Sequence, residues 1–264
     1  MNGWNFDPLE LSVLALAGAL YWRRASTLAR TGRPVPRPRI AAFAAGLLAL
    51  FAALVSPIDT LGEERLFSVH MLQHLLLGDV GALLLVLGLN GRLLRPVLRV
   101  RIVQRLRVLA HPCVALPLWA ANFVLWHLPV LFDAALRHDA IHALQHTLFV
   151  GFGMLMWAAL IEPLPGPAWF TAPWKIPYVL GVWLVMLVLS QVFIWAGHPF
   201  YIRYGLTDQK AGGGVMLVES AFTMLPALVW VLLQVLRESE ARQRLVDAGV
   251  APSTATRAAR YGRA

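Results

Sequence analysis

The sequence predicts an all-α membrane protein, a polytopic bundle of seven transmembrane helices with its N-terminus outside and its C-terminus in the cytoplasm. Three observations support this class. Of the 264 residues, 58% are hydrophobic and only 14% are charged, whereas about 25% of the residues in a soluble domain are charged. Apolar runs of about 20 residues recur along the chain. Arginines gather in alternate connections between these runs, as expected for loops that stay in the cytoplasm.

Each apolar run is long enough to cross the hydrocarbon core of a bilayer as a helix. We expect membrane spans at residues 5–22, 40–56, 66–89, 109–130, 140–161, 176–196 and 214–236. Proline-rich segments at 31–40 and 162–177 separate some of them, and proline breaks helices where the backbone can meet water or headgroups. The predicted organisation is therefore a seven-helix transmembrane domain over residues 1–236 and a basic, flexible cytoplasmic tail over residues 237–264.

The distribution of lysine and arginine sets the orientation. Six arginines lie in residues 23–39, six in residues 90–107 and six beyond residue 236, and Lys175 lies on the same side. The other side holds Arg65, Arg137, Arg203 and Lys210. Because positive segments resist translocation, the side with the first group is the cytoplasm. The N-terminus then lies outside and the C-terminus inside, which requires an odd number of spans. Topology and contact with anionic lipid account for the basic segments, so we expect no nucleic-acid partner.

This orientation places seven of the eight histidines on the outer side of the membrane. They are His70, His74, His127, His138, His142, His146 and His198, and only His111 lies near the cytoplasm. The motif H-x-L-Q-H occurs twice, at residues 70–74 and 142–146. Since residues i, i+3 and i+4 share one face of a helix, each repeat presents two histidines and a glutamine together.

Two neutral imidazoles one helical turn apart can bind one metal ion, so two facing repeats would supply four nitrogens to one site. The predicted ligands are His70, His74, His142 and His146, with Gln73 and Gln145 fixing the ring tautomers. Further groups that could assist are Met71, His138, Asp79 and Glu219. Small residues beneath the repeats, among them Gly78, Gly151 and Gly153, allow the helices to approach closely.

Imidazole suits copper, zinc, iron and nickel, so the ligand type alone does not select the metal. One interpretation is a copper or other metal ion held at the outer face for delivery or assembly. A second is haem b bound by one histidine from each helix, which leaves the histidine one turn away unexplained. A di-iron oxygenase is least favoured, because the further H-x-x-H-H motifs of that class are absent. The single cysteine, Cys113, lies near the cytoplasmic face, so we expect no thiol ligand outside.

Four motifs follow one another along the chain: S-P-x-D at 56–59, H-M-x-x-H at 70–74, W-H-x-P at 126–129 and H-x-x-x-H at 142–146. In these motifs the chain resembles the CtaG-type family of bacterial cytochrome c oxidase assembly factors. The resemblance is strong over the second to fifth spans and weaker over the last two. It implies a multi-pass protein of the bacterial plasma membrane, not itself an enzyme, that helps to assemble a haem–copper oxidase.

The histidines that match the family motifs are His70, His74, His127, His142 and His146. The resemblance further implies oxidase subunits as partners and a role in supplying copper to them. We therefore expect an outward-facing histidine cluster that binds copper and passes it on by ligand exchange, more weakly as the imidazoles protonate. A haem-b-binding redox protein and a metal-free scaffold for oxidase subunits are the alternatives.

Overall fold

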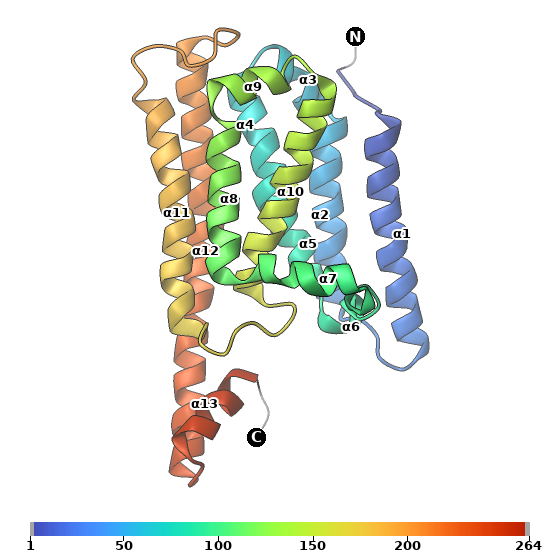
Figure 1. The fold of residues 1–264 in the computed structure, drawn as a ribbon, viewed down its shortest axis with the longest axis vertical. Helices are drawn as coiled ribbons and strands as arrows, with labels where there is room; N and C mark the ends of the chain where they lie inside the picture. The colour runs from blue at the N-terminus through green and yellow to red at the C-terminus, as the bar shows by residue number, and fades with distance from the viewer. Residues whose placement is uncertain (1–2, 262–264) are drawn as a thin grey trace.

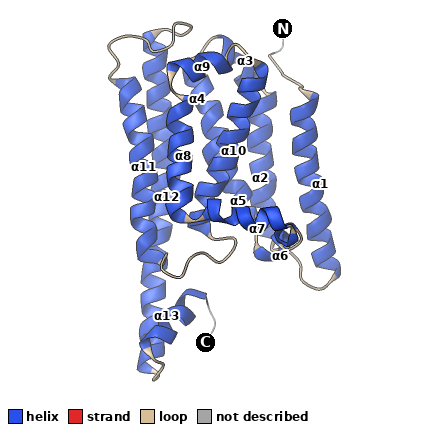
Figure 2. Cartoon of the chain, viewed as in Figure 1, coloured by secondary structure: helices blue, strands red, loops and turns tan. Residues whose placement is uncertain are grey.

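The computed structural model of the chain describes residues 3–261, and every regular element in this range is a helix (Figures 1 and 2). The first part contains α1 (Pro8–Arg30), α2 (Arg37–Val55), α3 (Pro57–Glu64), α4 (Phe67–Leu75), the π-helix η1 (Leu76–Gly81), α5 (Ala82–Gly88), α6 (Gly91–Leu94), the 3-10 helix η2 (Val97–Arg99), α7 (Arg101–Leu106) and the 3-10 helix η3 (Arg107–Ala110). The second part contains α8 (Pro112–Trp126), α9 (Pro129–Ala135), α10 (Asp139–Ile161), α11 (Ala172–Ile194), α12 (Leu206–Asp247) and α13 (Pro252–Tyr261).

Five of the described helices are long and apolar enough to cross a membrane: α2, the continuous helix α4–η1–α5, α10, α11 and α12. The segment Arg101–Ala110, which comprises α7 and η3, meets α8 at a bend of 79°. If these two parts form one broken span, they add a sixth. Helix α1 carries Glu10, Arg23 and Arg24 within its length and is not among the five. The structure thus supports an all-α membrane protein, while the count of seven spans and the direction of insertion remain predictions.

The long helices stand side by side along one axis (Figure 1). Helices α3 and α9 lie across one end of this bundle, and α6 and α7 lie across the other (Figure 1). We call these the α3/α9 end and the α6/α7 end. The helix α4–η1–α5 is the most deeply buried of the five and packs against α2, α10 and α12. It therefore occupies the centre of the bundle.

The N-terminus of α4 is capped by a side chain from another helix. The carboxylate of Asp208, in the first turn of α12, accepts hydrogen bonds from the backbone N–H of Phe67 at 2.5 Å and from the Ser68 hydroxyl at 2.6 Å. The first N–H groups of a helix have no partner within the helix itself, so this carboxylate satisfies them and joins α4 to α12.

Replacing Asp208 with alanine is expected to lower the free energy of unfolding by about 1–2 kcal/mol, the usual cost of losing a helix cap. The exposed Asp247, at the far end of the same helix, provides the control. Thermal unfolding of the two purified variants in detergent measures the difference. Equal stabilities for Asp208→Ala and Asp247→Ala would contradict the capping role.

Helices α4–η1–α5 and α10 approach closely at two glycines. A methyl group added to Gly153 of α10 would overlap the carbonyl oxygen of Gly78 in η1. Gly151 faces open space instead, so of the two predicted glycines on this helix only Gly153 serves the contact. In the same region, Asp79 of η1 accepts a hydrogen bond from the indole of Trp157 at 2.7 Å and another from the Thr223 hydroxyl at 2.9 Å. The carboxyl group thus links η1 to α10 and α12.

Most of the described part of the predicted flexible tail is helical. Helix α12 continues past residue 236 to Asp247 without a break, and α13 folds back beside it (Figure 1). Arg260 of α13 and the buried Lys175 both form ion pairs with Glu162, at 2.6 and 3.1 Å. The Arg260 pair joins α13 to the loop between α10 and α11, and the Lys175 pair joins that loop to α11. The division into a transmembrane domain and a flexible tail stays a prediction.

Candidate metal site

The two H-x-L-Q-H repeats meet at the α3/α9 end of the bundle. The rings of His70 and His142 are stacked with their centroids 5.7 Å apart, and those of His74 and His146 are also 5.7 Å apart. Within each helix the two rings are 4.3 and 4.0 Å apart. Thus α4 and α10 bring all four predicted imidazoles into one buried cluster.

Three of these histidines have the geometry of metal ligands. One ring nitrogen from each of His70, His74 and His142 lies within 4.8 Å of the other two, and all three side chains are buried. Two nitrogens that bind one ion at about 2.1 Å each are at most ~4.2 Å apart. Small rotations of the rings are therefore enough to place all three around one ion. The ring of His146 contacts those of His74 and His142 but does not belong to this group.

Most of the ring nitrogens in this cluster have no hydrogen-bond partner among the described residues. Both nitrogens of His70, His74 and His146 are buried and unpaired, and so is Nε2 of His142. Buried polar atoms in folded proteins nearly always have a partner, because leaving one unpaired costs about 1–3 kcal/mol. Each ring can offer one nitrogen to a metal ion, so an ion held by all four histidines would satisfy four of these seven nitrogens.

Glu63, which belongs to none of the sequence motifs, contacts the histidine cluster. Its Oε1 lies 2.5 Å from Nδ1 of His142, which leaves Nε2 of that ring for a metal. A carboxylate that holds one nitrogen of an imidazole fixes the tautomer and strengthens the other nitrogen as a ligand. The hydroxyl of Tyr204 donates to the carbonyl oxygens of Gly62 and Glu63, at 2.8 and 3.1 Å, and so fixes the backbone beneath the carboxylate.

The S-P-x-D motif joins α3 to α4 beside the cluster. Ser56 caps α3, and Asp59 accepts hydrogen bonds from Gln73 at 2.6 Å and Asn5 at 2.9 Å. Burial raises the pKa of Asp59, while the hydrogen bonds from Asn5 and Gln73 oppose that shift. Gln73 also donates to the carbonyl of Ala53, so its amide joins α4 to α2 and α3 and makes no hydrogen bond to a ring.

The second glutamine, Gln145, is fully buried, and its two amide atoms have no hydrogen-bond partner among the described residues. The geometry therefore places Glu63, and neither glutamine, in hydrogen-bond contact with an imidazole of the cluster.

His127 and Met71 lie together beside the cluster. Nδ1 of His127 donates to the carbonyl of Phe123 at 2.6 Å, and Nε2 faces the sulfur of Met71 at 3.3 Å. The His127 ring is 6.2 Å from that of His74, and the Tyr201 hydroxyl donates to the His127 carbonyl at 2.7 Å. This arrangement presents one nitrogen and one sulfur atom, both good ligands for copper, next to the main group of histidines.

Three other predicted residues lie away from this group. His138 is exposed at the start of α10. Asp79 is bonded to Trp157 and Thr223 deeper in the bundle. Glu219, one turn before Thr223 on α12, has Asp79 as its main charged neighbour. The three-histidine group found among the described residues includes none of them.

Fold and site together define the class of the protein: a helical membrane protein that encloses a buried histidine cluster near one end of its bundle. The family described as cytochrome c oxidase caa3 assembly factor (Caa3_CtaG) matches residues 19–238, and the chain belongs to this family. The resemblance noted in the sequence motifs is thereby confirmed.

Relatives of this chain occur in mycobacteria. Uncharacterized proteins of Mycobacterium bovis and Mycobacterium tuberculosis are each 26% identical to it over 265 residues, which cover 89% of this chain and 40% of the relative. An uncharacterized protein of Mycobacterium leprae is 26% identical over 219 residues, 77% of this chain and 31% of the relative. The chain thus spans less than half the length of these relatives. No solved structure matched it.

Proposed function

We propose that this protein assists the assembly of a haem–copper cytochrome c oxidase in the bacterial plasma membrane by holding copper in its histidine cluster and passing it to an oxidase subunit. Membership of the oxidase assembly factor family supports the assembly role. The observation that carries the metal role is the convergence of one buried ring nitrogen from each of His70, His74 and His142, each within 4.8 Å of the other two. The role is that of a non-catalytic carrier.

The donor set favours copper over harder metal ions. Imidazole nitrogens bind copper well in both oxidation states, and the thioether of Met71 beside His127 adds a soft ligand that favours Cu(I). Calcium and magnesium prefer oxygen ligands, and the cluster presents mainly nitrogen. Glu63 keeps one nitrogen of His142 occupied, so that the other is directed at the metal.

The ring packing supports an ion rather than haem b. A haem would need two histidines separated by a flat macrocycle. His70 and His142 are already stacked, and each has its own i+4 neighbour in ring contact at 4.3 or 4.0 Å. The four rings form a cycle of neighbouring contacts with centroids 4.0, 4.3 and 5.7 Å apart, which suits an ion better than a macrocycle.

Copper titration of the purified chain tests this proposal. The wild-type protein is expected to bind about one copper ion per chain, as a site with four ligands would, and the double variant His70→Ala/His74→Ala is expected to bind almost none. The double variant His111→Ala/His198→Ala removes two histidines outside the cluster and should bind as the wild type does. A haem absorption band in the purified protein, or equal copper binding by both variants, would contradict the proposal.

The assembly role has a separate test. In cells that carry the chain as their only copy, His70→Ala/His74→Ala should lower the copper content of the oxidase, while its subunits still co-purify with the variant. A normal copper content in the oxidase of these cells would show that the chain acts as a metal-free scaffold.

A further inference from the structure

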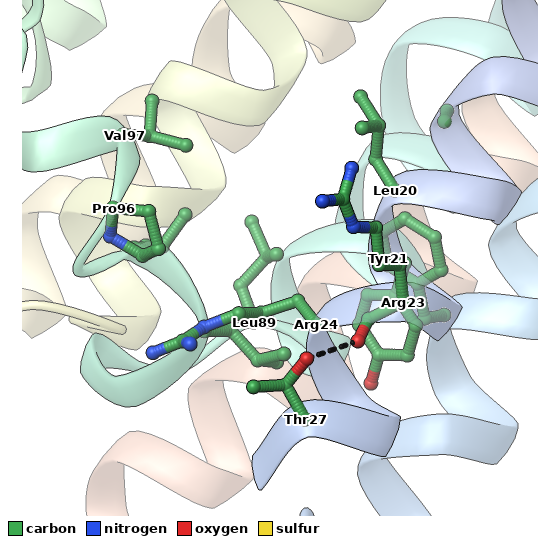
Figure 3. A pocket seen from close by; sticks show the side chains of 12 residues that line it. Leu20, Tyr21, Arg23, Arg24, Thr27, Leu89, Pro96 and Val97 are labelled. Atoms are coloured by element: carbon green, nitrogen blue, oxygen red, sulfur yellow. Dashed lines mark hydrogen bonds between the residues drawn. The ribbon is translucent and has the colours of Figure 1, made fainter.

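A cavity of about 520 Å³ lies between α1 and the segment that connects α5 to η2, at the α6/α7 end of the bundle (Figure 3). Its walls are mainly apolar, formed by side chains that include Leu20, Tyr21, Phe43, Leu89, Leu93 and Val97. The side chains of Arg23 and Arg24 also line it (Figure 3). The cavity thus combines an apolar interior with two guanidinium groups, and it lies at the opposite end from the histidine cluster.

The arginines of this cavity have no acidic counterpart. No aspartate or glutamate lines the cavity. Nη2 of Arg24 donates to the carbonyl of Arg92 at 2.9 Å, while its Nε is buried without a hydrogen-bond partner among the described residues. A neighbouring cavity of about 430 Å³ is lined by Arg33 and Arg92, again with no acidic side chain. Donor groups therefore face both cavities without an anion from the protein itself.

The positive charge extends through the surrounding chain. Residues 23–39 and residues 90–107 hold six arginines each and no aspartate or glutamate. Between the arginines of the second segment, Val97, Val100 and Ile102 are exposed apolar side chains. Basic and apolar residues that alternate in this way are typical of a segment lying at a membrane surface, where it attracts anionic headgroups.

We propose that the cavity between α1 and α6 binds one anionic phospholipid from the surrounding bilayer. The phosphate pairs with Arg24, whose Nε is buried without a partner among the described residues, since guanidinium groups bind phosphate oxygens through charge-assisted hydrogen bonds. Arg23 adds a second positive charge to the same cavity. An acyl chain lies against Leu20, Leu93 and Leu94. The lipid fills the space between α1 and the bundle, and so it fastens a helix that packs mainly against α2 and α6.

Lipid binding to the full chain in detergent, followed by native mass spectrometry, tests this proposal with phosphatidylglycerol and phosphatidylcholine as probes. The wild type should retain one phosphatidylglycerol in preference to phosphatidylcholine. The variant Arg23→Gln/Arg24→Gln should bind it roughly thirtyfold more weakly, as expected for the loss of two charges close to an anionic headgroup. The variant Arg99→Gln/Arg101→Gln removes the same charge from exposed positions of the same end and should retain the lipid.

A second variant tests lipid binding in the same cavity if the variant Arg23→Gln/Arg24→Gln does not fold. Ala17 lies on the wall of the cavity, and Ala17→Phe fills the acyl position while leaving both arginines in place, so it should also lose the lipid. Equal retention of phosphatidylglycerol by wild type, Arg23→Gln/Arg24→Gln and Ala17→Phe would overturn the proposal, as would equal retention of the two lipids by the wild type. None of these outcomes depends on copper binding.

Discussion

A single methyl group at Gly153 is expected to destabilise the bundle severely, whereas the same change two residues earlier, at Gly151, should be harmless or slightly stabilising. The Cβ of Gly153→Ala would overlap the backbone oxygen of Gly78 in η1, which cannot rotate away as a side chain could. Overpacking of this kind usually lowers the free energy of unfolding by about 1–3 kcal/mol. We expect a value near the top of this range, because the clash is with backbone. Gly151→Ala meets no atom within 4 Å and gains about 0.5–1 kcal/mol from the better helix former.

Thermal unfolding of the two alanine variants in detergent measures this difference directly. Because η1 continues from the helix that carries His70 and His74, the forced separation of η1 from α10 should also lower copper binding by Gly153→Ala. Gly151→Ala should bind copper as the wild type does. If Gly153→Ala proves as stable as Gly151→Ala, the close contact between the two helices is contradicted.

Replacing Glu63 with glutamine is expected to weaken copper binding by about 10–100-fold, the usual effect of removing the group that orients a metal-binding histidine. Glutamine keeps the size of the side chain and an oxygen that can accept from Nδ1 of His142. It lacks the negative charge that strengthens the opposite nitrogen as a ligand. The expected loss therefore lies in affinity, with the stoichiometry and the unfolding temperature close to those of the wild type.

The adjacent Glu64 is exposed and provides the matched control, since Glu64→Gln removes the same charge one residue away. Competition titrations against a copper chelator of known affinity compare the two variants. Equal affinities for Glu63→Gln and Glu64→Gln would show that the contact between Glu63 and His142 does not tune the site. A loss of copper stoichiometry in both variants would instead indicate a general electrostatic effect at this end of the bundle.

The sequence predicted the histidine cluster because its signal is local. The spacing of His70 and His74, and that of His142 and His146, places each pair on one helical face regardless of what surrounds the helix. The apolar runs likewise predicted the long helices, although α1, interrupted by charges, is not among the helices apolar enough to cross a membrane.

The parts that the sequence did not predict depend on contacts between distant segments or on irregular backbone. Glu63 reaches His142 because the chain turns between α3 and α4, and no periodicity carries across that turn. Gln73, predicted to support a ring, bonds to Asp59 instead, because the approach of α3 decides which group its amide meets. The tail after residue 236 is rich in charge, which predicted a flexible segment. The ion pair between Arg260 and Glu162 joins residues far apart in the chain, and no local pattern indicates it.

The π-helical turn η1 determines how the central helix divides its two surfaces. A π-turn contains one residue more than an α-turn, which advances the angular phase of every side chain beyond it by about 100° relative to an unbroken α-helix. The half before η1 directs His70 and His74 toward α10, and the half beyond it directs Leu85 and Gly88 toward α2. One helix can thereby present its imidazoles to α10 and still bring its lower half against α2. The direction in which His70 and His74 point therefore depends on the single additional residue of η1.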